Sequence, residues 1–222
     1  MRRHPASRQS QQGFTLVEIA VVLVIIGLLL GGVLKGQELI NSARVKALSQ
    51  DLRNIPTMLY GYQDRFRTLP GDDAQAVNHL GATALNGNGN GLIEGDWDTN
   101  EADKETCKFW QHLRLGNFLA GSTALTAGGD CGIQPHNSVG GILGIEVANS
   151  THTAFIAGMR GTYLCSSGIQ GRYVRQLDQT MDDGDPAAGS LRAVTVGSAR
   201  GSAAVALNTL DDESTYTICL EI

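Results

Sequence analysis

The chain has 222 residues, a formal net charge of −5 and 42% hydrophobic residues. That hydrophobic content is ordinary for a globular protein and excludes wholesale disorder, while the acidic balance argues against a general nucleic-acid binder. The 28 glycines, many of them beside Asn, Asp or Ser, predict a body rich in loops.

The N-terminal part of the chain divides into a basic leader and a long apolar stretch. Residues 1–13 contain arginines and no acid, and the stretch from Phe14 to Leu34 carries a single charge, Glu18. A helix of this length spans about 30 Å, the thickness of a bilayer core. By the positive-inside rule the leader stays cytoplasmic and the rest of the chain is exported. No small-residue cleavage site follows the apolar stretch, so we expect a retained single-pass anchor in the inner membrane.

The string Gly13-Phe14-Thr15-Leu16-Val17-Glu18 stands between the basic leader and the apolar stretch. It resembles the class III leader of type IV pilins and type II secretion pseudopilins. The resemblance implies cleavage between Gly13 and Phe14 by a prepilin peptidase, followed by N-methylation of Phe14. It also implies that Glu18 pairs with the N-terminal amine of a neighbouring subunit during assembly, because two charges that are costly in an apolar core become tolerable as a pair. The alternative interpretation places Glu18 near the headgroups at the membrane edge.

Beyond Leu34 the apolar residues continue on one helical face, at Val45, Leu48, Leu52, Ile55, Leu59, Tyr62 and Phe66. This spacing predicts one long helix from about Phe14 to about Tyr62, which Pro56 should kink or deprive of regular bonding. The predicted organisation is a cleaved leader (1–13), a membrane or filament-core helix (14–34), its amphipathic continuation (35–66) and an exported head (67–222).

The head is predicted to combine short helices with strands. Asp72 or Asp73 should cap a short helix that runs through His79. Two further helices are expected over Glu105–Leu115 and Gly171–Met181, and strands over 141–147, 153–156, 191–196 and 215–222. The expected fold is α+β, with a long N-terminal helix packed on a loop-rich head that has a mainly antiparallel sheet.

Residues 86–98 allow two interpretations. Oxygen-bearing side chains alternate with glycine as in the start of a calcium loop, at Asn86, Asn88, Asn90, Glu94, Asp96 and Asp98. However, the first three are neutral amides, and Trp97 takes the twelfth position, where a calcium loop has a bidentate Glu. A solvated Asn-Gly turn is the competing interpretation.

Four cysteines lie in the part predicted to be exported, where an even number favours two disulfides. Of the three connectivities we favour Cys107–Cys131, which closes a Gly-rich loop, and Cys165–Cys219, which attaches the C-terminal strand to the head. A zinc site has little support, because no two cysteines have the usual close spacing. With so much glycine, we expect the head to depend on disulfides rather than on a large core.

Residues that could support catalysis are scattered. His152 lies in a polar turn, and Asp182, Asp183 and Asp185 form either paired carboxylates or a solvated turn. The turn is favoured, because nothing apolar nearby would raise a carboxyl pKa. The sequence therefore offers no positive case for an enzyme or a cofactor. A basic patch that could serve an adhesin or a DNA-uptake receptor would have to come from Arg160, Arg172, Arg175, Arg192 and Arg200.

The resemblance to type IV pilins implies a structural subunit of a type IV pilus-like filament. The body is large for a repeating major subunit, which favours a minor or specialised pilin. The alternatives are a type II secretion pseudopilin and a membrane-anchored adhesin or DNA-uptake module. The implied partners are the prepilin peptidase, an inner-membrane assembly platform, other pilin subunits and membrane lipid, and the assembled filament would be periplasmic or extracellular.

Overall fold

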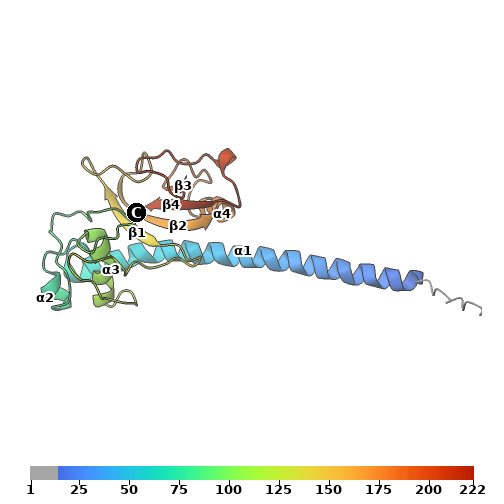
Figure 1. Ribbon diagram of the computed structural model, residues 1–222, viewed down its shortest axis with the longest axis horizontal. Helices are drawn as coiled ribbons and strands as arrows, with labels where there is room; N and C mark the ends of the chain where they lie inside the picture. Colours follow the sequence, from blue (N-terminus) through green and yellow to red (C-terminus); the bar gives the residue numbers. More distant parts are fainter. Residues whose placement is uncertain (1–14) are drawn as a thin grey trace, which may run out of the picture. The chain divides into compact units, whose positions relative to one another are not determined.

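The computed structural model describes residues 15–222 and contains helices and one four-stranded sheet (Figure 1). The chain divides into two compact units, one ending at Ser42 and one from Ala43 to Ile222, and α1 runs across this boundary. In chain order the elements are α1 (Leu16–Phe66), α2 (Ala76–Leu80), α3 (Glu105–Leu115), β1 (Leu143–Ala148), β2 (Gly161–Gln170), α4 (Gly171–Met181), β3 (Leu191–Thr195), the short 3₁₀ helix η1 (Leu207–Thr209) and β4 (Thr215–Glu221).

In the described part of the chain, α1 is the helix that is long and apolar enough to cross a membrane, with a mean hydropathy of 2.8 over its most apolar window. It is a single helix of 51 residues that continues through Pro56 instead of ending there. Proline removes one backbone hydrogen bond from a helix interior. Buried Leu52, Ile55 and Leu59 on the same stretch pack into the head and offset that loss.

The sheet has the order β1-β2-β4-β3, and all three strand pairs are antiparallel. β2 and β4 are therefore the central strands. Their register is interrupted between Ser166 and Ile169, where Gly168 has a positive φ of 73°. A residue without a side chain tolerates this conformation and allows the irregularity in β2.

Successive side chains of the strands enter two separate cores on opposite faces of the sheet. Leu164 and Ile218 belong to the larger core, which also receives buried side chains from the C-terminal half of α1, from α3 and from α4. Tyr163, Cys165 and Cys219 belong to a smaller core. The head thus has a more substantial apolar interior than the sequence predicted, while its dependence on the two disulfides stays a prediction.

The α+β layout with a long N-terminal helix and an antiparallel sheet is confirmed. The helices α3 and α4 have the predicted bounds, and β1, β3 and β4 lie close to theirs. The expected strand over 153–156 is wrong: apart from an isolated bridge at Ile156, this segment is a loop. The central strand β2 was not predicted, because the Ser-Ser-Gly in its sequence interrupts the apolar pattern.

Candidate functional site

The N-terminus of α1 is closed by a reciprocal interaction between Thr15 and Glu18. One carboxylate oxygen of Glu18 accepts hydrogen bonds from the Thr15 backbone N–H at 2.8 Å and from its hydroxyl at 2.9 Å. The Glu18 N–H in turn donates to the Thr15 hydroxyl oxygen at 3.2 Å. This is a capping box, and its T-x-x-E signature is legible in the sequence. Glu18 is exposed, and its carboxylate is held at the helix start, while Gly13 and Phe14 lie outside the described residues.

The N-terminal unit presents a continuous apolar helix surface. The large hydrophobic side chains of α1 between Leu16 and Ile40 are 45–91% exposed. Soluble monomers rarely leave apolar surface of this extent in water. This part of α1 therefore requires either a bilayer or other apolar helices around it.

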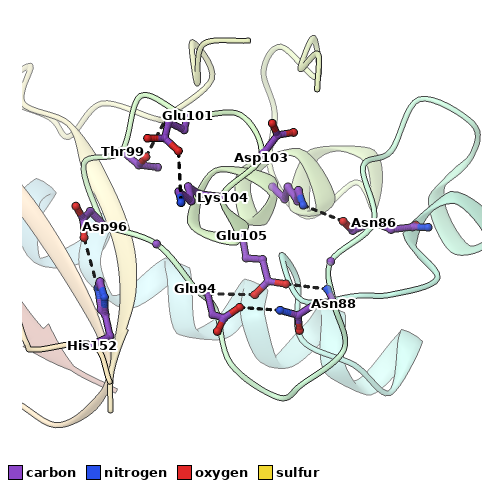
Figure 2. Close-up of a pocket in the computed structure, with 13 residues that line it drawn as sticks. Asn86, Asn88, Glu94, Asp96, Thr99, Glu101, Asp103, Lys104, Glu105 and His152 are labelled. Carbon is purple, nitrogen blue, oxygen red and sulfur yellow. Dashed lines mark hydrogen bonds and ion pairs between the residues drawn. The ribbon is translucent and has the colours of Figure 1, made fainter. Parts of the chain in front are cut away.

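The Asn-Gly loop folds around a buried carboxylate of the chain itself. Asp72, only 2% exposed, accepts backbone N–H donations from Gly89, Asn90 and Gly91 at 2.7–3.0 Å. Buried Glu105 accepts two more, from Asn88 at 2.8 Å and from Glu94 at 3.1 Å (Figure 2). The loop backbone therefore directs donors inward, which is the polarity of an anion-binding nest and opposite to that of a calcium loop.

The side-chain oxygens expected to form a calcium loop serve other purposes. Asn88 and Asn90 each accept an N–H from two residues later, and Asn86 accepts the N–H of Val77. The Asn88 amide also donates to Glu94 at 2.7 Å. All six predicted ligands, which include Asp96 and Asp98, are exposed. The structure therefore favours the Asn-Gly turn over the calcium loop.

An open polar cleft of about 700 Å³ lies beside this loop. Its acidic lining includes Glu94, Asp96, Glu101 and Asp103, and Lys104 forms an ion pair with Glu101 at 3.4 Å (Figure 2). Burial raises the pKa of Glu105 at the base of the cleft, in opposition to the backbone donors from the loop. The cleft is open, and we assign no reaction to it.

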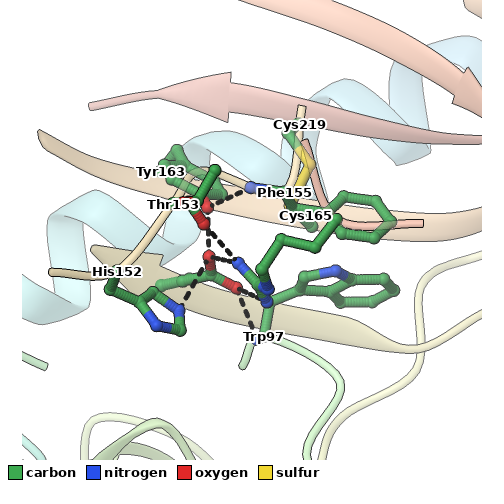
Figure 3. The surroundings of a disulfide bond; sticks show 9 residues. Trp97, His152, Thr153, Phe155, Tyr163, Cys165 and Cys219 are labelled. Carbon is green, nitrogen blue, oxygen red and sulfur yellow. Dashed lines mark hydrogen bonds and ion pairs between the residues drawn. A yellow bond between two sulfur atoms is a disulfide. The ribbon is translucent and has the colours of Figure 1, made fainter. Parts of the chain in front are cut away.

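The smaller core contains a buried acid with a full set of partners. Glu146 on β1 is 0% exposed; it accepts the Trp97 N–H at 2.8 Å and is bonded by the Tyr163 hydroxyl and the Arg200 guanidinium. His152 lies at the edge of this group, 3.2 Å from Glu146, near the Cys165–Cys219 disulfide (Figure 3). Burial, together with the neighbouring Glu146, raises the pKa of Tyr163. These contacts join three loops to the sheet, and they were not predicted because the partners are distant in sequence.

Four of the five arginines considered for a basic patch have acceptors inside the head. Arg172 pairs with Glu213, Arg175 with Asp212, and Arg200 with Asp96 and Glu146. The Arg192 guanidinium donates to the backbone oxygens of Gly189 and Ala157. Three of the four are thus paired with acidic side chains, so the structure adds no support for a nucleic-acid interface.

The four cysteines form two disulfides, Cys107–Cys131 and Cys165–Cys219, the pairs favoured from the sequence. The first connects α3 to the loop before β1. The second connects the adjacent central strands β2 and β4, in which Cys165 and Cys219 are directly opposite in register.

Residues 8–34 match the family model of the prokaryotic N-terminal methylation motif. The match spans Gly13, Phe14 and Glu18, together with the apolar part of α1, and it confirms the class III prepilin leader. The motif supports a type IV pilin-like or pseudopilin-like protein, and it is typical of structural proteins rather than of enzymes. No curated protein and no solved structure matches it.

Proposed function

We propose that the chain is a structural subunit of a type IV pilus-like filament, in the role of a minor or specialised pilin. The proposal is carried by the methylation motif at residues 8–34, which coincides with the exposed apolar surface of α1. A type II secretion pseudopilin shares both features, so it is the nearest alternative within the same class. The role is structural rather than enzymatic.

Processing is the first step of this function. A prepilin peptidase removes residues 1–13 by cleaving after Gly13, whose missing side chain suits a narrow protease subsite. The new N-terminal amine of Phe14 is then methylated. The apolar part of α1 keeps the subunit in the inner membrane with its head exported, where the assembly platform adds it to other pilins.

Glu18 has the central role in assembly. In the single chain its carboxylate is satisfied by Thr15, at 2.8 and 2.9 Å. Inside a bundle of apolar helices this neutral partner leaves the charge uncompensated, which is unfavourable by several kcal/mol. The positively charged N-terminal amine of the adjacent subunit neutralises the carboxylate, and the pair thereby sets the axial register of the helices.

The replacement Glu18→Gln tests this role, and Glu38→Gln is its matched control. Glu38 is on the same helix, but it pairs with Lys35 on an exposed face where an ion pair is worth little. We expect Glu18→Gln to insert normally and to lose at least about tenfold in co-purification with the other pilins. Glu38→Gln should assemble at the wild-type level. Equal incorporation of both variants would refute the electrostatic role of Glu18.

A further inference from the structure

Three acidic side chains converge where α4 ends and the chain turns toward β3. They are Asp178 in the last turns of α4, Asp182 immediately after the helix, and Asp183 in the turn itself. A carboxylate oxygen from each lies within 4.8 Å of the other two. The three residues differ in exposure: Asp178 is buried, Asp182 is partly exposed and Asp183 is exposed.

Asp178 is the unusual member of the group, because it is 0% exposed and only half satisfied. One carboxylate oxygen accepts the Gly184 N–H at 2.6 Å. The other, Oδ2, is buried and has no hydrogen-bond partner among the described residues. A buried carboxylate oxygen without a donor is unfavourable, and most such atoms in folded proteins have a partner.

Asp178 was not among the residues of the predicted solvated turn, and its surroundings differ from theirs. α4 packs its apolar face into the larger core through Val174 and Leu177. Burial, reinforced by the neighbouring acids, raises the pKa of Asp178 to about 6. An apolar environment thus does reach one carboxyl of the group.

The charge of the group is not balanced by a side chain. In the described part of the chain, no lysine or arginine forms an ion pair with Asp178, Asp182 or Asp183. The buried Glu146 differs in this respect, since Arg200 neutralises it. The Asp178 group therefore combines a buried unpaired oxygen with uncompensated negative charge.

We propose that Asp178, Asp182 and Asp183 bind a divalent cation, specifically Ca²⁺. The ligand set consists of carboxylate oxygens alone, which suits a hard cation rather than zinc or copper. Ca²⁺ accepts flexible sets of six to eight oxygen ligands that include several carboxylates, whereas Mg²⁺ requires a near-ideal octahedron and usually keeps several waters beside only one or two carboxylates. Water completes the coordination on the exposed side, next to Asp183.

The group is already positioned by the local backbone. Asp182 accepts the Leu191 N–H at 2.8 Å and the Ser190 hydroxyl at 3.1 Å, which fixes its side chain against the start of β3. Gly189 permits this approach, because a Cβ there would lie 2.0 Å from the Asp182 carboxylate. Each carboxylate oxygen that accepts one hydrogen bond retains a lone pair for a metal ion.

Calcium binding can be measured on the full chain in detergent micelles after treatment with a chelator. Equilibrium dialysis with radiolabelled Ca²⁺ gives stoichiometry and affinity, and thermal unfolding is followed with and without 10 mM Ca²⁺. We expect one ion per chain, with a dissociation constant on the order of 10⁻⁴–10⁻³ M, as in extracellular modules. The melting temperature should rise by about 3–10 °C.

Two ligand variants and one control make the test specific. Asp178→Asn should lose at least about tenfold in affinity and, in chelator, should melt no lower than the wild type, because the buried charge is gone. Asp183→Asn, an exposed change compatible with folding, should also weaken binding. Asp185→Asn, in the same turn but outside the three ligands, should bind as the wild type does.

Either of two results would overturn the proposal. One is the absence of bound Ca²⁺ at 10 mM. The other is a rise in melting temperature that is equal for Ca²⁺ and Mg²⁺ and that Asp185→Asn reduces as much as Asp183→Asn does. That pattern would indicate that the cations only screen a charged turn.

Discussion

The Cys165–Cys219 disulfide joins the two central strands of the sheet, and its removal allows a quantitative prediction. The two cysteines are separated by 54 residues and both are fully buried. In the chain-entropy treatment, cross-linking a loop of that length contributes about 4 kcal/mol by restricting the unfolded chain. Replacing both cysteines by alanine should therefore lower the free energy of unfolding by about 4 kcal/mol.

The second disulfide, Cys107–Cys131, has a separation of 24 residues, and the same treatment gives about 3 kcal/mol. The two contributions together amount to about 7 kcal/mol, compared with a typical domain stability of about 5–15 kcal/mol. The apolar cores on both faces of the sheet supply the remaining stabilisation. Full reduction should consequently leave the head close to its unfolding threshold at room temperature.

Urea unfolding of the full chain in detergent, followed by tryptophan fluorescence, measures these losses. Trp97 packs in the smaller core with Cys165, and Trp110 lies in the larger core with Cys107, so each disulfide has a nearby probe. Reductant should further destabilise the variant that lacks Cys165 and Cys219, by about 3 kcal/mol. A loss below about 1 kcal/mol in the double alanine variant would refute the loop-closure reasoning.

Three further predictions concern buried polar groups. Asp72→Asn should destabilise the head by about 2–3 kcal/mol in urea unfolding, because the loop N–H groups lose a charged acceptor. The exposed change Glu94→Gln should alter the free energy of unfolding little. A larger loss in Glu94→Gln than in Asp72→Asn would instead support the calcium loop. Arg200→Met should cost about 3 kcal/mol in the same assay, since it leaves Glu146 buried without its cation, and a neutral result would mean that Tyr163 and Trp97 suffice. Burial lowers the pKa of His112, so below about pH 6.5 the unfolded state binds more protons than the folded state does. The free energy of unfolding should therefore fall there by up to about 1.4 kcal/mol per pH unit. In His112→Gln this part of the pH dependence should vanish, and an unchanged slope in the variant would contradict the prediction.

Local patterns were sufficient to predict much of the fold. α4 was predicted because Val174, Leu177 and Met181 recur on one face, and β4 because its residues alternate regularly. β2 was missed because its stability comes from pairing with strands on both sides rather than from its own composition. The loop at 153–156 resembled a strand because its apolar residues, including Phe155 and Ile156, fill the smaller core without strand pairing.

The candidate sites also divide into those that a local sequence pattern reveals and those that only long-range contacts create. The leader and Glu18 were identified because they form one continuous string, while Asp72, Glu146 and Asp178 acquire their roles from burial and from distant partners. Glu146 meets Arg200 across 54 positions of the sequence, and Asp72 meets the glycine loop 17–19 residues later. Only the folded chain brings these donors and acceptors together.

The most direct test of the account is the N-terminal residue of the protein recovered from membranes with and without the prepilin peptidase. N-terminal sequencing and intact mass should show a chain that begins with methylated Phe14 when the peptidase is present, and a full-length chain when it is absent. The variant Gly13→Val should stay full-length in both cases. A chain that retains residues 1–13 in the presence of an active peptidase, or a Gly13→Val protein that begins at Phe14, would contradict the account.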